Sequence, residues 1–451
     1  MLFSSLTFLI WFLPIVLIIH FVLPQRLRNG FLLLASLFFY AWGEIAYLPL
    51  ILTVLVFNVI FGILIDRCEG RARRLLMILA VVFNIGTLVF YKYSGFLMGV
   101  IGLSAYAPSV TMPLGISFFT FQITGYIIDI YRKKIPAEKN VINVMTFIVL
   151  FPQLIAGPIV LYTDVQNEMR KRTITASDLE KGMTIFIAGL GAKVLLANPM
   201  GALYQDILSI KSASAPAMWL ATLASVLQLY FDFAGYSSMA IGMGHMMGFK
   251  FPQNFNHPLS ARSMRDFWRR WHMTLGAWLR DYVYIPLGGS RKGTRRTIIN
   301  LFFVWFLSGF WHGADWNHIL WGLWFFMFIA LEKTAFGPWI AQRPRLGLLY
   351  AQFVFFLSLP LFSYSSLSES GDHFARMFSP VFSTDVLYYL RGHGVLLIIA
   401  MIFCMPSVFH FFNQLFARSK IARIALMTSV MVLSLAALVN EAYNPFIYFR
   451  F

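Results

Sequence analysis

Hydrophobic stretches alternate with short polar segments along the whole chain. A helix needs about 20 apolar residues to cross a bilayer. Runs that reach or approach this length occupy residues 6–23, 50–65, 76–90, 113–131, 218–233, 347–362, 395–412 and 426–438. With weaker segments counted, the pattern predicts roughly a dozen helices, some of them short or re-entrant. We therefore expect an all-α, polytopic membrane protein with a single membrane domain over residues 1–451.

Composition supports the bilayer as the solvent of this chain. Of its 451 residues, 59% are hydrophobic and 12% are charged, and the mean hydropathy is +0.70. A soluble domain of this size needs more polar surface to cover its core. Cys68 and Cys404 are the two cysteines, so the sequence offers neither a disulfide framework nor a cysteine-based metal site.

The net charge of +17 comes from loops rather than from a soluble basic domain. Because Lys and Arg concentrate in cytoplasmic loops of membrane proteins, this distribution predicts orientation and not nucleic-acid binding. The basic loops are residues 25–30, 67–74, 132–139, 169–181, 260–296, 333–345 and 418–423. Connections with little positive charge are residues 43–47, 94–112, 210–216 and 366–383. If the basic loops are cytoplasmic, both chain termini lie outside.

Two stretches interrupt this alternation. Residues 145–160 lie between two basic loops and contain Pro152, Gly157 and Pro158. The short apolar segments 298–310 and 318–330 leave the basic side and return to it. Each is either a re-entrant element, which needs protein or water around its backbone, or an ordinary helical hairpin.

Residues 251–289 combine aromatic, basic and histidine side chains. A helix capped by Ser260 or Ser263 is expected to run to about Tyr284, where Pro286 stops it. Trp268, Trp271, Leu275 and Trp278 recur at helical spacing, which suits a helix lying in the cytoplasmic interface. Arg269 and Arg280 are candidates for binding a donor that carries phosphates, such as coenzyme A. A helix that only anchors the protein to lipid headgroups would explain the Arg and Trp residues of this segment, but it would not explain the presence of His272.

Residues 308–322 contain a second polar cluster inside an apolar stretch. His312 lies between Gly309 and Gly313, with Asp315, Asn317 and His318 close behind. A histidine at membrane depth is costly without a partner or a polar cavity, so His312 is a functional candidate. The alternative is a structural histidine bonded to a carbonyl group. The sequence has no HExxH pattern and no Cys ligand, so we predict no metal site.

These segments resemble the membrane-bound O-acyltransferase family, and within it the alginate-type polysaccharide O-acetyltransferases and the teichoic-acid D-alanyltransferases. The resemblance rests on PLGISFFTFQ at 113–122, QLYFDFAGYSSM at 228–239, FWRRWH at 267–272, WLRDYVYIPLGG at 278–289 and SGFWHG at 308–313. It implies that His312 is the catalytic histidine and His272 a second polar site residue. Asp232, Tyr236 and Asn317 lie in matching motifs as supporting residues.

Residues 446–451 resemble a C-terminal FxYxxF motif found in small partner proteins of teichoic-acid D-alanylation. There the tyrosine is a candidate acyl carrier, so Tyr448 is either a catalytic relay or an aromatic anchor at the outer interface. The predicted orientation places Tyr448 outside, as a relay requires.

The resemblance implies transfer of an acetyl-type group from a cytoplasmic thioester, such as acetyl-coenzyme A, to hydroxyls of an exported or cell-wall polysaccharide. His312 would act as general base, and Asn317 or a backbone N–H would hold the oxyanion. The expected setting is a bacterial plasma membrane, with an extracytoplasmic partner and no bound cofactor. Alternatives are D-alanyl transfer, acylation of lipid or protein and, more remotely, transport. A transporter predicts inverted repeats, and none is evident in the sequence.

Overall fold

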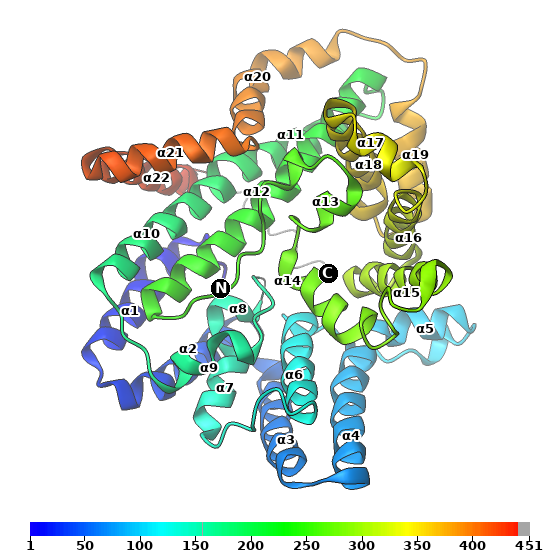
Figure 1. Cartoon of the computed structure of the whole chain (residues 1–451). Coiled ribbons are helices and arrows are strands. Elements are labelled where there is room, and N and C mark those ends of the chain that lie inside the picture. Colours follow the sequence, from blue (N-terminus) through cyan, green and yellow to red (C-terminus); the bar gives the residue numbers. More distant parts are fainter. Residues whose placement is uncertain (156, 441–451) are drawn as a thin grey trace. The chain divides into compact units, whose positions relative to one another are not determined.

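The chain is helical throughout the part that the structure describes. The computed structural model describes residues 1–155 and 157–440, and within these ranges all regular structure is helix, without strands. Figure 1 shows these helices along the chain. They divide into two compact units, Met1–Phe186 with Ser237–Gln253 and Ile187–Tyr236 with Asn254–Phe451. The predicted all-α class is confirmed, whereas the single domain remains a prediction.

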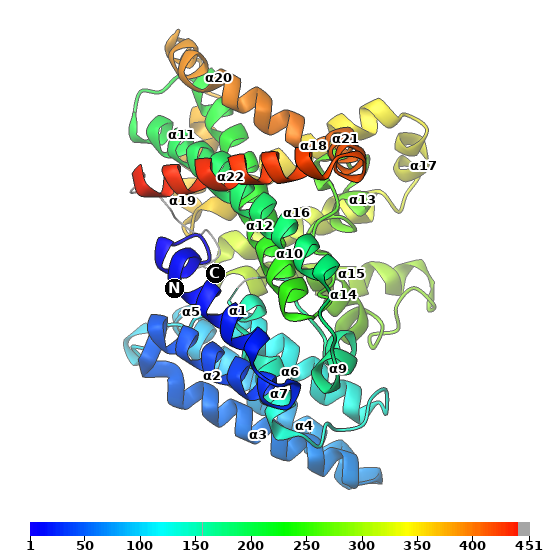
Figure 2. The same cartoon turned by 90° about the vertical axis from the view of Figure 1, so that its left-hand side faces the viewer.

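The first unit combines three helices of 19 or 20 residues, α2, α3 and α4, with shorter helical segments. Its elements are η1 (Phe8–Phe12), α1 (Leu13–Val22), α2 (Gln25–Glu44), η2 (Ile45–Tyr47), α3 (Leu48–Arg67), α4 (Gly70–Leu88), η3 (Val89–Tyr93), α5 (Ser94–Val100), η4 (Ser104–Tyr106), α6 (Ile116–Tyr131), α7 (Val141–Val149), α8 (Phe151–Leu154) and α9 (Tyr162–Arg170). α10 (Ala176–Gly191) begins in this unit. Figures 1 and 2 show α3 and α4 side by side, and both pack against α6, whose side chains are almost all buried.

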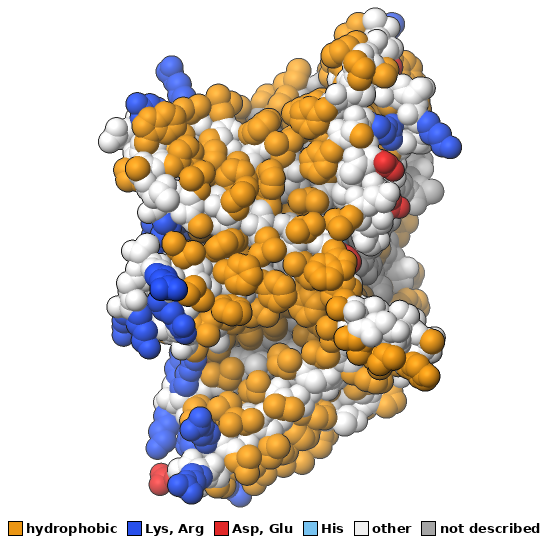
Figure 3. Space-filling view, turned by 90° about the vertical axis from the view of Figure 1, so that its right-hand side faces the viewer, with side chains coloured by type: hydrophobic (Ala, Val, Ile, Leu, Met, Phe, Trp, Pro, Cys, Tyr) orange, Lys and Arg blue, Asp and Glu red, His pale blue; other side chains and the backbone are white. Residues whose placement is uncertain are grey.

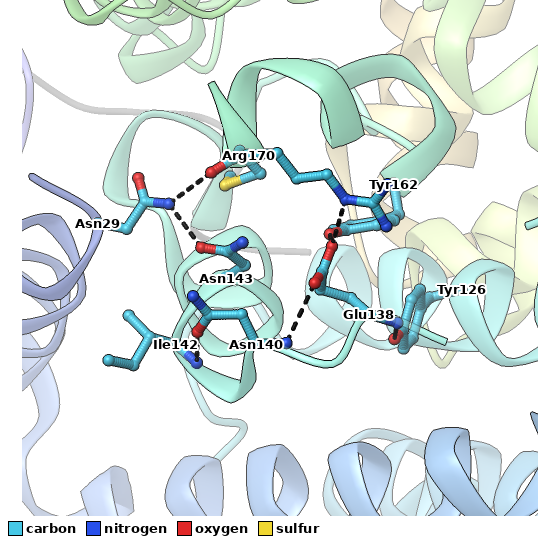
Figure 4. Close-up of polar contacts among 9 residues, drawn as sticks. Asn29, Tyr126, Glu138, Asn140, Ile142, Asn143, Tyr162 and Arg170 are labelled. Carbon is cyan, nitrogen blue, oxygen red and sulfur yellow. Dashed lines mark hydrogen bonds and ion pairs between the residues drawn. The ribbon is translucent and has the colours of Figure 1, made fainter. Parts of the chain in front are cut away.

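A buried carboxylate fixes the basic loop after α6. Glu138 accepts hydrogen bonds from the Tyr162 hydroxyl and from Arg170 Nε, each at 2.8 Å, while its own backbone N–H donates to the Tyr126 hydroxyl at 3.1 Å (Figure 4). Burial raises the pKa of Glu138, but the bonds from Arg170, Asn140 and Tyr162 outweigh this and hold it below its usual value. The carboxylate thus ties the loop to α6 and α9.

The second unit contains the longest helix and most of the conspicuous motifs. Its elements are η5 (Ala192–Ala197), α11 (Asn198–Ser209), η6 (Pro258–Ser260), α13 (Met264–Trp268), α14 (Met273–Leu279), η7 (Arg280–Tyr284), α15 (Gly293–His312), α16 (Trp316–Leu331), α17 (Phe336–Ala341), α18 (Pro344–Ser363), α19 (Leu367–Met377), α20 (Asp385–Phe403), α21 (Pro406–Arg418) and α22 (Lys420–Asn440). α12 (Ala215–Met247) has most of its length in this unit and ends in the first.

Seven helical stretches among the described residues are long and apolar enough to cross a membrane. They are Gln25–Arg67, Gly70–Val100, Ala176–Ser209, Ala215–Met247, Pro344–Ser363, Asp385–Phe403 and Lys420–Asn440, and Phe8–Val22 and Trp316–Leu331 are shorter apolar helices. Burial distinguishes a helix in the protein core from one on the outside. In the most apolar part of each helix, 83% is buried in protein for α12 but only 6% for α22. Hydrophobic side chains are spread over the face of the molecule in Figure 3, as expected of helices that contact lipid. The chain is a multi-pass membrane protein.

The two interrupted stretches turn out differently. Residues 141–154 form α7 and α8, which have nine and four residues. At about 1.5 Å per residue neither can cross a bilayer, as expected of a re-entrant element. The segments predicted at 298–310 and 318–330 belong to α15 and α16, which pack together as a helical hairpin. Its re-entrant or membrane-spanning character stays a prediction.

The single helix expected from Ser260 or Ser263 to Tyr284 is wrong in its middle. Ser263 does cap a helix, because its Oγ accepts a hydrogen bond from the Asp266 backbone N–H at 3.0 Å. However, α13 ends at Trp268, and His272 adopts a left-handed backbone with φ +42° before α14 begins. The expected interfacial position of the aromatic face is also not what the structure shows, since Trp271 and Trp278 are buried among protein side chains.

Candidate functional site

Three glycines allow α15 and α16 to touch along the hairpin that carries His312. A Cβ atom on Gly309 would collide with the His318 carbonyl oxygen and approach Gly322 Cα at 3.1 Å. A Cβ atom on Gly313 would collide with the His318 ring. Because only glycine leaves this space, the motif around His312 serves close helix packing as well as any chemistry.

His312 ends α15 inside a cage of aromatic rings. Its side chain is buried, and its ring centroid lies 5.0 Å from that of Trp321 and 5.4 Å from that of Phe362. α15 thus delivers an imidazole to a site from which aromatic rings exclude bulk water. A polar group there interacts more strongly with a reacting charge than it does in water.

His318 lies in the first turn of α16 and is hydrogen-bonded to the Asp315 carboxylate. Asp315 caps α16 by accepting the His318 backbone N–H at 2.9 Å, and its two oxygens lie 2.8 and 2.9 Å from His318 Nδ1. The carboxylate therefore accepts a hydrogen bond from Nδ1–H, which fixes the orientation of the His318 ring. The Phe362 ring contacts His318 at 5.3 Å as well as His312, so the hairpin brings both histidines to one aromatic wall.

His272 is positioned by Asn254. Asn254 Oδ1 accepts hydrogen bonds from the Thr274 backbone N–H at 3.3 Å and the Thr274 hydroxyl at 2.9 Å, and it lies 3.0 Å from His272 Nδ1. A backbone N–H can only donate, so the shared atom is the amide oxygen and His272 Nδ1 carries the hydrogen. Burial lowers the pKa of His272 to about 3, which keeps the ring neutral at physiological pH.

Trp311 joins the two predicted histidines into one cluster. Its ring centroid lies 6.0 Å from the His272 ring and 4.9 Å from the His312 ring. Phe233 on α12 packs edge-on against His272 at 4.8 Å. The residues predicted from two separate motifs therefore meet in the second unit.

Asp232 lies on α12 beside this cluster and forms a buried ion pair that sequence reasoning missed. Lys193 Nζ is 2.8 Å from Asp232 Oδ1, and each side chain is 1% exposed. Lys193 also donates to Asn198 Oδ1 at 2.8 Å. The signal was present in the sequence, because a lone lysine within the apolar run 185–197 calls for a buried partner. Tyr236 is fully buried one turn beyond Asp232.

Asn317 has an anchoring role. Its side-chain nitrogen donates to the Tyr364 carbonyl at 2.8 Å, to the Ser366 carbonyl at 3.0 Å and to Ser370 Oγ at 2.8 Å. These bonds tie α16 to the turn between α18 and α19. Both amide hydrogens already have acceptors in the protein, which disfavours Asn317 as the oxyanion donor.

The remaining predicted residues lie apart from this arrangement. Arg269 and Arg280 are exposed, and Arg280 makes two hydrogen bonds, 2.7 and 3.0 Å long, to the Asp281 carboxylate. Tyr448 lies outside the described residues. Within residues 1–155 and 157–440, no group of three or more His, Cys, Asp or Glu side chains is arranged to hold a metal ion.

Comparison with known proteins places this helical architecture in a family. Residues 132–368, which contain both histidine motifs, match the membrane-bound O-acyltransferase family (MBOAT). The chain belongs to this family. The predicted resemblance and the predicted enzyme class, a membrane-bound O-acyltransferase, are confirmed by this membership.

Relatives with curated names include proteins of three kinds. The chain is 42% identical over 346 residues to the probable alginate O-acetylase AlgI of Pseudomonas aeruginosa, a match that covers 74% of this chain and 66% of that protein. It is 35% identical to the peptidoglycan O-acetyltransferase of Helicobacter pylori, with 72% and 68% covered. The teichoic acid D-alanyltransferase of Streptococcus thermophilus is 31% identical, over 47% of this chain and 54% of that protein.

Proposed function

We propose that this protein moves an acetyl-type group from a cytoplasmic thioester to hydroxyls of an exported or cell-wall polysaccharide. The observation that carries the proposal is His312, held in an aromatic cage within a chain 42% identical to a probable alginate O-acetylase. Relatives that share two thirds or more of their length with this chain, at 35% identity or above, include probable alginate O-acetylases and a peptidoglycan O-acetyltransferase. Acetyl transfer to a polymer is therefore the preferred chemistry.

His312 is proposed as the general base. It takes the proton from the attacking hydroxyl, the oxygen attacks the thioester carbonyl, and the carbon–sulfur bond breaks. The thiolate that leaves recovers the proton, so the products are an ester and a free thiol. The surrounding rings of Trp311, Trp321 and Phe362 keep bulk water away from this step, which limits hydrolysis of the donor.

His272 is proposed as the second polar contact for the reacting groups. Its Nδ1–H is held by Asn254, so the neutral ring has its lone pair on Nε2. A neutral imidazole in this state accepts a hydrogen bond and can position a hydroxyl. Since the Asn317 amide is committed to α18 and α19, backbone N–H groups are the proposed donors to the oxyanion.

The route of the acyl group across the membrane also forms part of the proposal. The exposed Arg269 and Arg280 suit the phosphates of coenzyme A on the basic side, which the positive-inside rule makes cytoplasmic. An extracytoplasmic partner and a relay through Tyr448 would carry the group to the polymer in a bacterial plasma membrane. D-alanyl transfer is the second candidate, supported by the match to the Streptococcus thermophilus protein over 225 residues.

The test is to delete the gene, restore it as wild type or His312→Ala, and measure ester-linked acetate and D-alanine in isolated polysaccharide and peptidoglycan. We expect wild type to restore acetate on one polymer and His312→Ala to restore none. Restored D-alanine with unchanged acetate would replace the proposal by its second candidate.

A further inference from the structure

Another buried histidine, His373, lies outside the cluster of His272 and His312 and is hydrogen-bonded to a tyrosine hydroxyl in the second unit. His373 on α19 is buried, and its Nδ1 lies 3.0 Å from the Tyr364 hydroxyl. Its other nitrogen, Nε2, lies 3.0 Å from the Thr222 hydroxyl of α12. The Tyr204 hydroxyl donates to the Tyr364 oxygen at 3.4 Å. Elements far apart in the sequence thus converge on one imidazole.

The partners of Thr222 determine which nitrogen of His373 carries the hydrogen. The single hydroxyl hydrogen of Thr222 points to acceptors other than His373, namely the Met218 carbonyl at 3.0 Å and Met377 Sδ at 3.5 Å. The Thr222 oxygen therefore accepts from His373 Nε2–H, and Nδ1 holds the lone pair. Because Nδ1 holds the lone pair, the Tyr364 hydroxyl donates to it, and the Tyr364 oxygen accepts from Tyr204. The network sets His373 as an acceptor for the Tyr364 proton.

Tyr364 lies next to the helical hairpin that carries His312. It directly follows α18, and its carbonyl accepts the Asn317 amide at 2.8 Å. Phe362, two residues earlier, contacts the rings of both His312 and His318. The following residues 366–383 form a connection with little positive charge, which the positive-inside rule places on the acceptor side. Tyr364 is only half-buried, so its hydroxyl is more accessible than His373.

We propose that the Tyr364 hydroxyl is a nucleophile that carries the acyl group on its way to the acceptor, with His373 as its base and Thr222 as a positioning residue. The arrangement has the three parts of an activated nucleophile: a hydroxyl, a base within hydrogen-bond reach, and a third group that orients the base. This inference rests on the proposed function, because it needs an acyl thioester as donor.

The chemistry balances without a further reactant. The Tyr364 oxygen attacks the thioester carbonyl and its proton passes to His373 Nδ1, while the thiolate leaves and takes up that proton as a thiol. In this route His373 takes the place of His312 as the base for attack on the thioester. His312 then takes the proton from the acceptor hydroxyl that attacks acyl-Tyr364, and the departing phenol oxygen recovers that proton. Burial raises the pKa of Tyr364, so the phenol is protonated at neutral pH and needs this base. Burial, helped by Arg376, lowers the pKa of His373 to about 4, so the ring is neutral and able to accept.

The experiment uses the full chain in membranes with radiolabelled acetyl-coenzyme A. Samples are quenched in acid, the acyl-peptides are located by mass spectrometry, and transfer to polymer is measured in parallel. The variants are Tyr364→Phe, which keeps the ring, His373→Gln, and Tyr388→Phe as a control tyrosine that is 78% exposed on α20. The yield of each variant in the membrane checks its folding.

We expect label on the peptide that contains Tyr364, at least a tenfold loss of label and of transfer in Tyr364→Phe and His373→Gln, and no change in Tyr388→Phe. Wild-type transfer by Tyr364→Phe, or loss of transfer without any acyl-Tyr364 in the wild type, overturns the inference. If transfer still depends on His312 in that case, the proposed function stands. If wild-type membranes transfer no acetyl group at all, both the inference and the proposed function fail.

Discussion

His272 has a backbone conformation that bulky residues seldom adopt, and its surroundings keep it there. Its φ of +42° places it in the left-handed region, which costs of order 1 kcal/mol or more for a residue other than glycine. The Met273 backbone N–H donates to the Asn254 carbonyl at 2.9 Å, and the Asn256 N–H donates to the Arg270 carbonyl at 2.9 Å. These bonds hold both sides of the strained residue. Strain that is maintained in this way is typical of residues with a function.

Asn254→Ala tests whether the orientation of His272 matters for catalysis. The change removes the acceptor for His272 Nδ1–H, so the ring loses its fixed tautomer, and we expect roughly a tenfold lower rate of acyl transfer. Thr274→Val is the matched control, because it removes a different hydrogen bond to the same oxygen. Equal rates for the two variants would show that Asn254 supports only the local fold.

His373 makes the stability of the protein depend on pH. Burial, and then Arg376, lowers its pKa from 6.5 to about 4. Between these values the unfolded chain binds a proton that the folded chain does not, so stability is full above pH 6.5 and falls as the pH drops toward 4. From about pH 7.5 to about pH 5 the expected loss is about 2 kcal/mol.

The measurement is thermal unfolding of the detergent-solubilised protein across this pH range. His373→Gln is expected to be less stable at pH 7.5, since it loses the fit to Tyr364 and Thr222, but to show a shallower decline on acidification. A decline as steep as that of the wild type would assign the acid sensitivity to other groups.

At the scale of elements, α12 and the π-helical turn η5 are joined by a buried charge pair. The Lys193 and Asp232 side chains are each 1% exposed and contact one another at 2.8 Å. Removing one partner from such a pair leaves an unpaired buried charge and costs about 3–5 kcal/mol, whereas replacing both with apolar residues is often neutral.

We therefore expect Lys193→Met to lower the unfolding temperature sharply and Lys193→Met with Asp232→Leu to recover much of the loss. Thermal unfolding of the purified variants measures this directly. A double variant less stable than Lys193→Met alone would show that Asp232 contributes to stability through contacts other than this pair.

The elements that sequence reasoning predicted poorly are those determined by tertiary contacts. Residues 263–284 have helical periodicity and a valid cap at Ser263, so a continuous helix was the reasonable prediction. The break at residues 269–272 depends on hydrogen bonds to Asn254 and to Asn256, which lie too far along the chain for local periodicity to reveal. The close approach of Gly309 and Gly322 explains why α15 and α16 pair as a hairpin, but a re-entrant hairpin and a spanning one make the same contact, so the choice between them stays a prediction.

At the scale of the whole molecule, composition and hydropathy were sufficient to predict a helical, multi-pass membrane protein. The motifs around His272 and His312 were sufficient for the family, and the structure brings both histidines to the Trp311 ring. The Lys193–Asp232 pair and the Tyr364–His373 pair were missed, because each joins residues that no single motif contains. Orientation in the membrane and the roles of Tyr448, Arg269 and Arg280 stay predictions.

The most direct test of this account is the rate of acetyl transfer from radiolabelled acetyl-coenzyme A to polymer in membranes that contain His312→Ala. His410→Ala on α21 is the control, because that histidine is exposed and hydrogen-bonded to Gln414. The account predicts a loss of about 100-fold or more for His312→Ala and an unchanged rate for His410→Ala. Acetyl transfer by His312→Ala at the wild-type rate, with normal amounts of protein in the membrane, would contradict it.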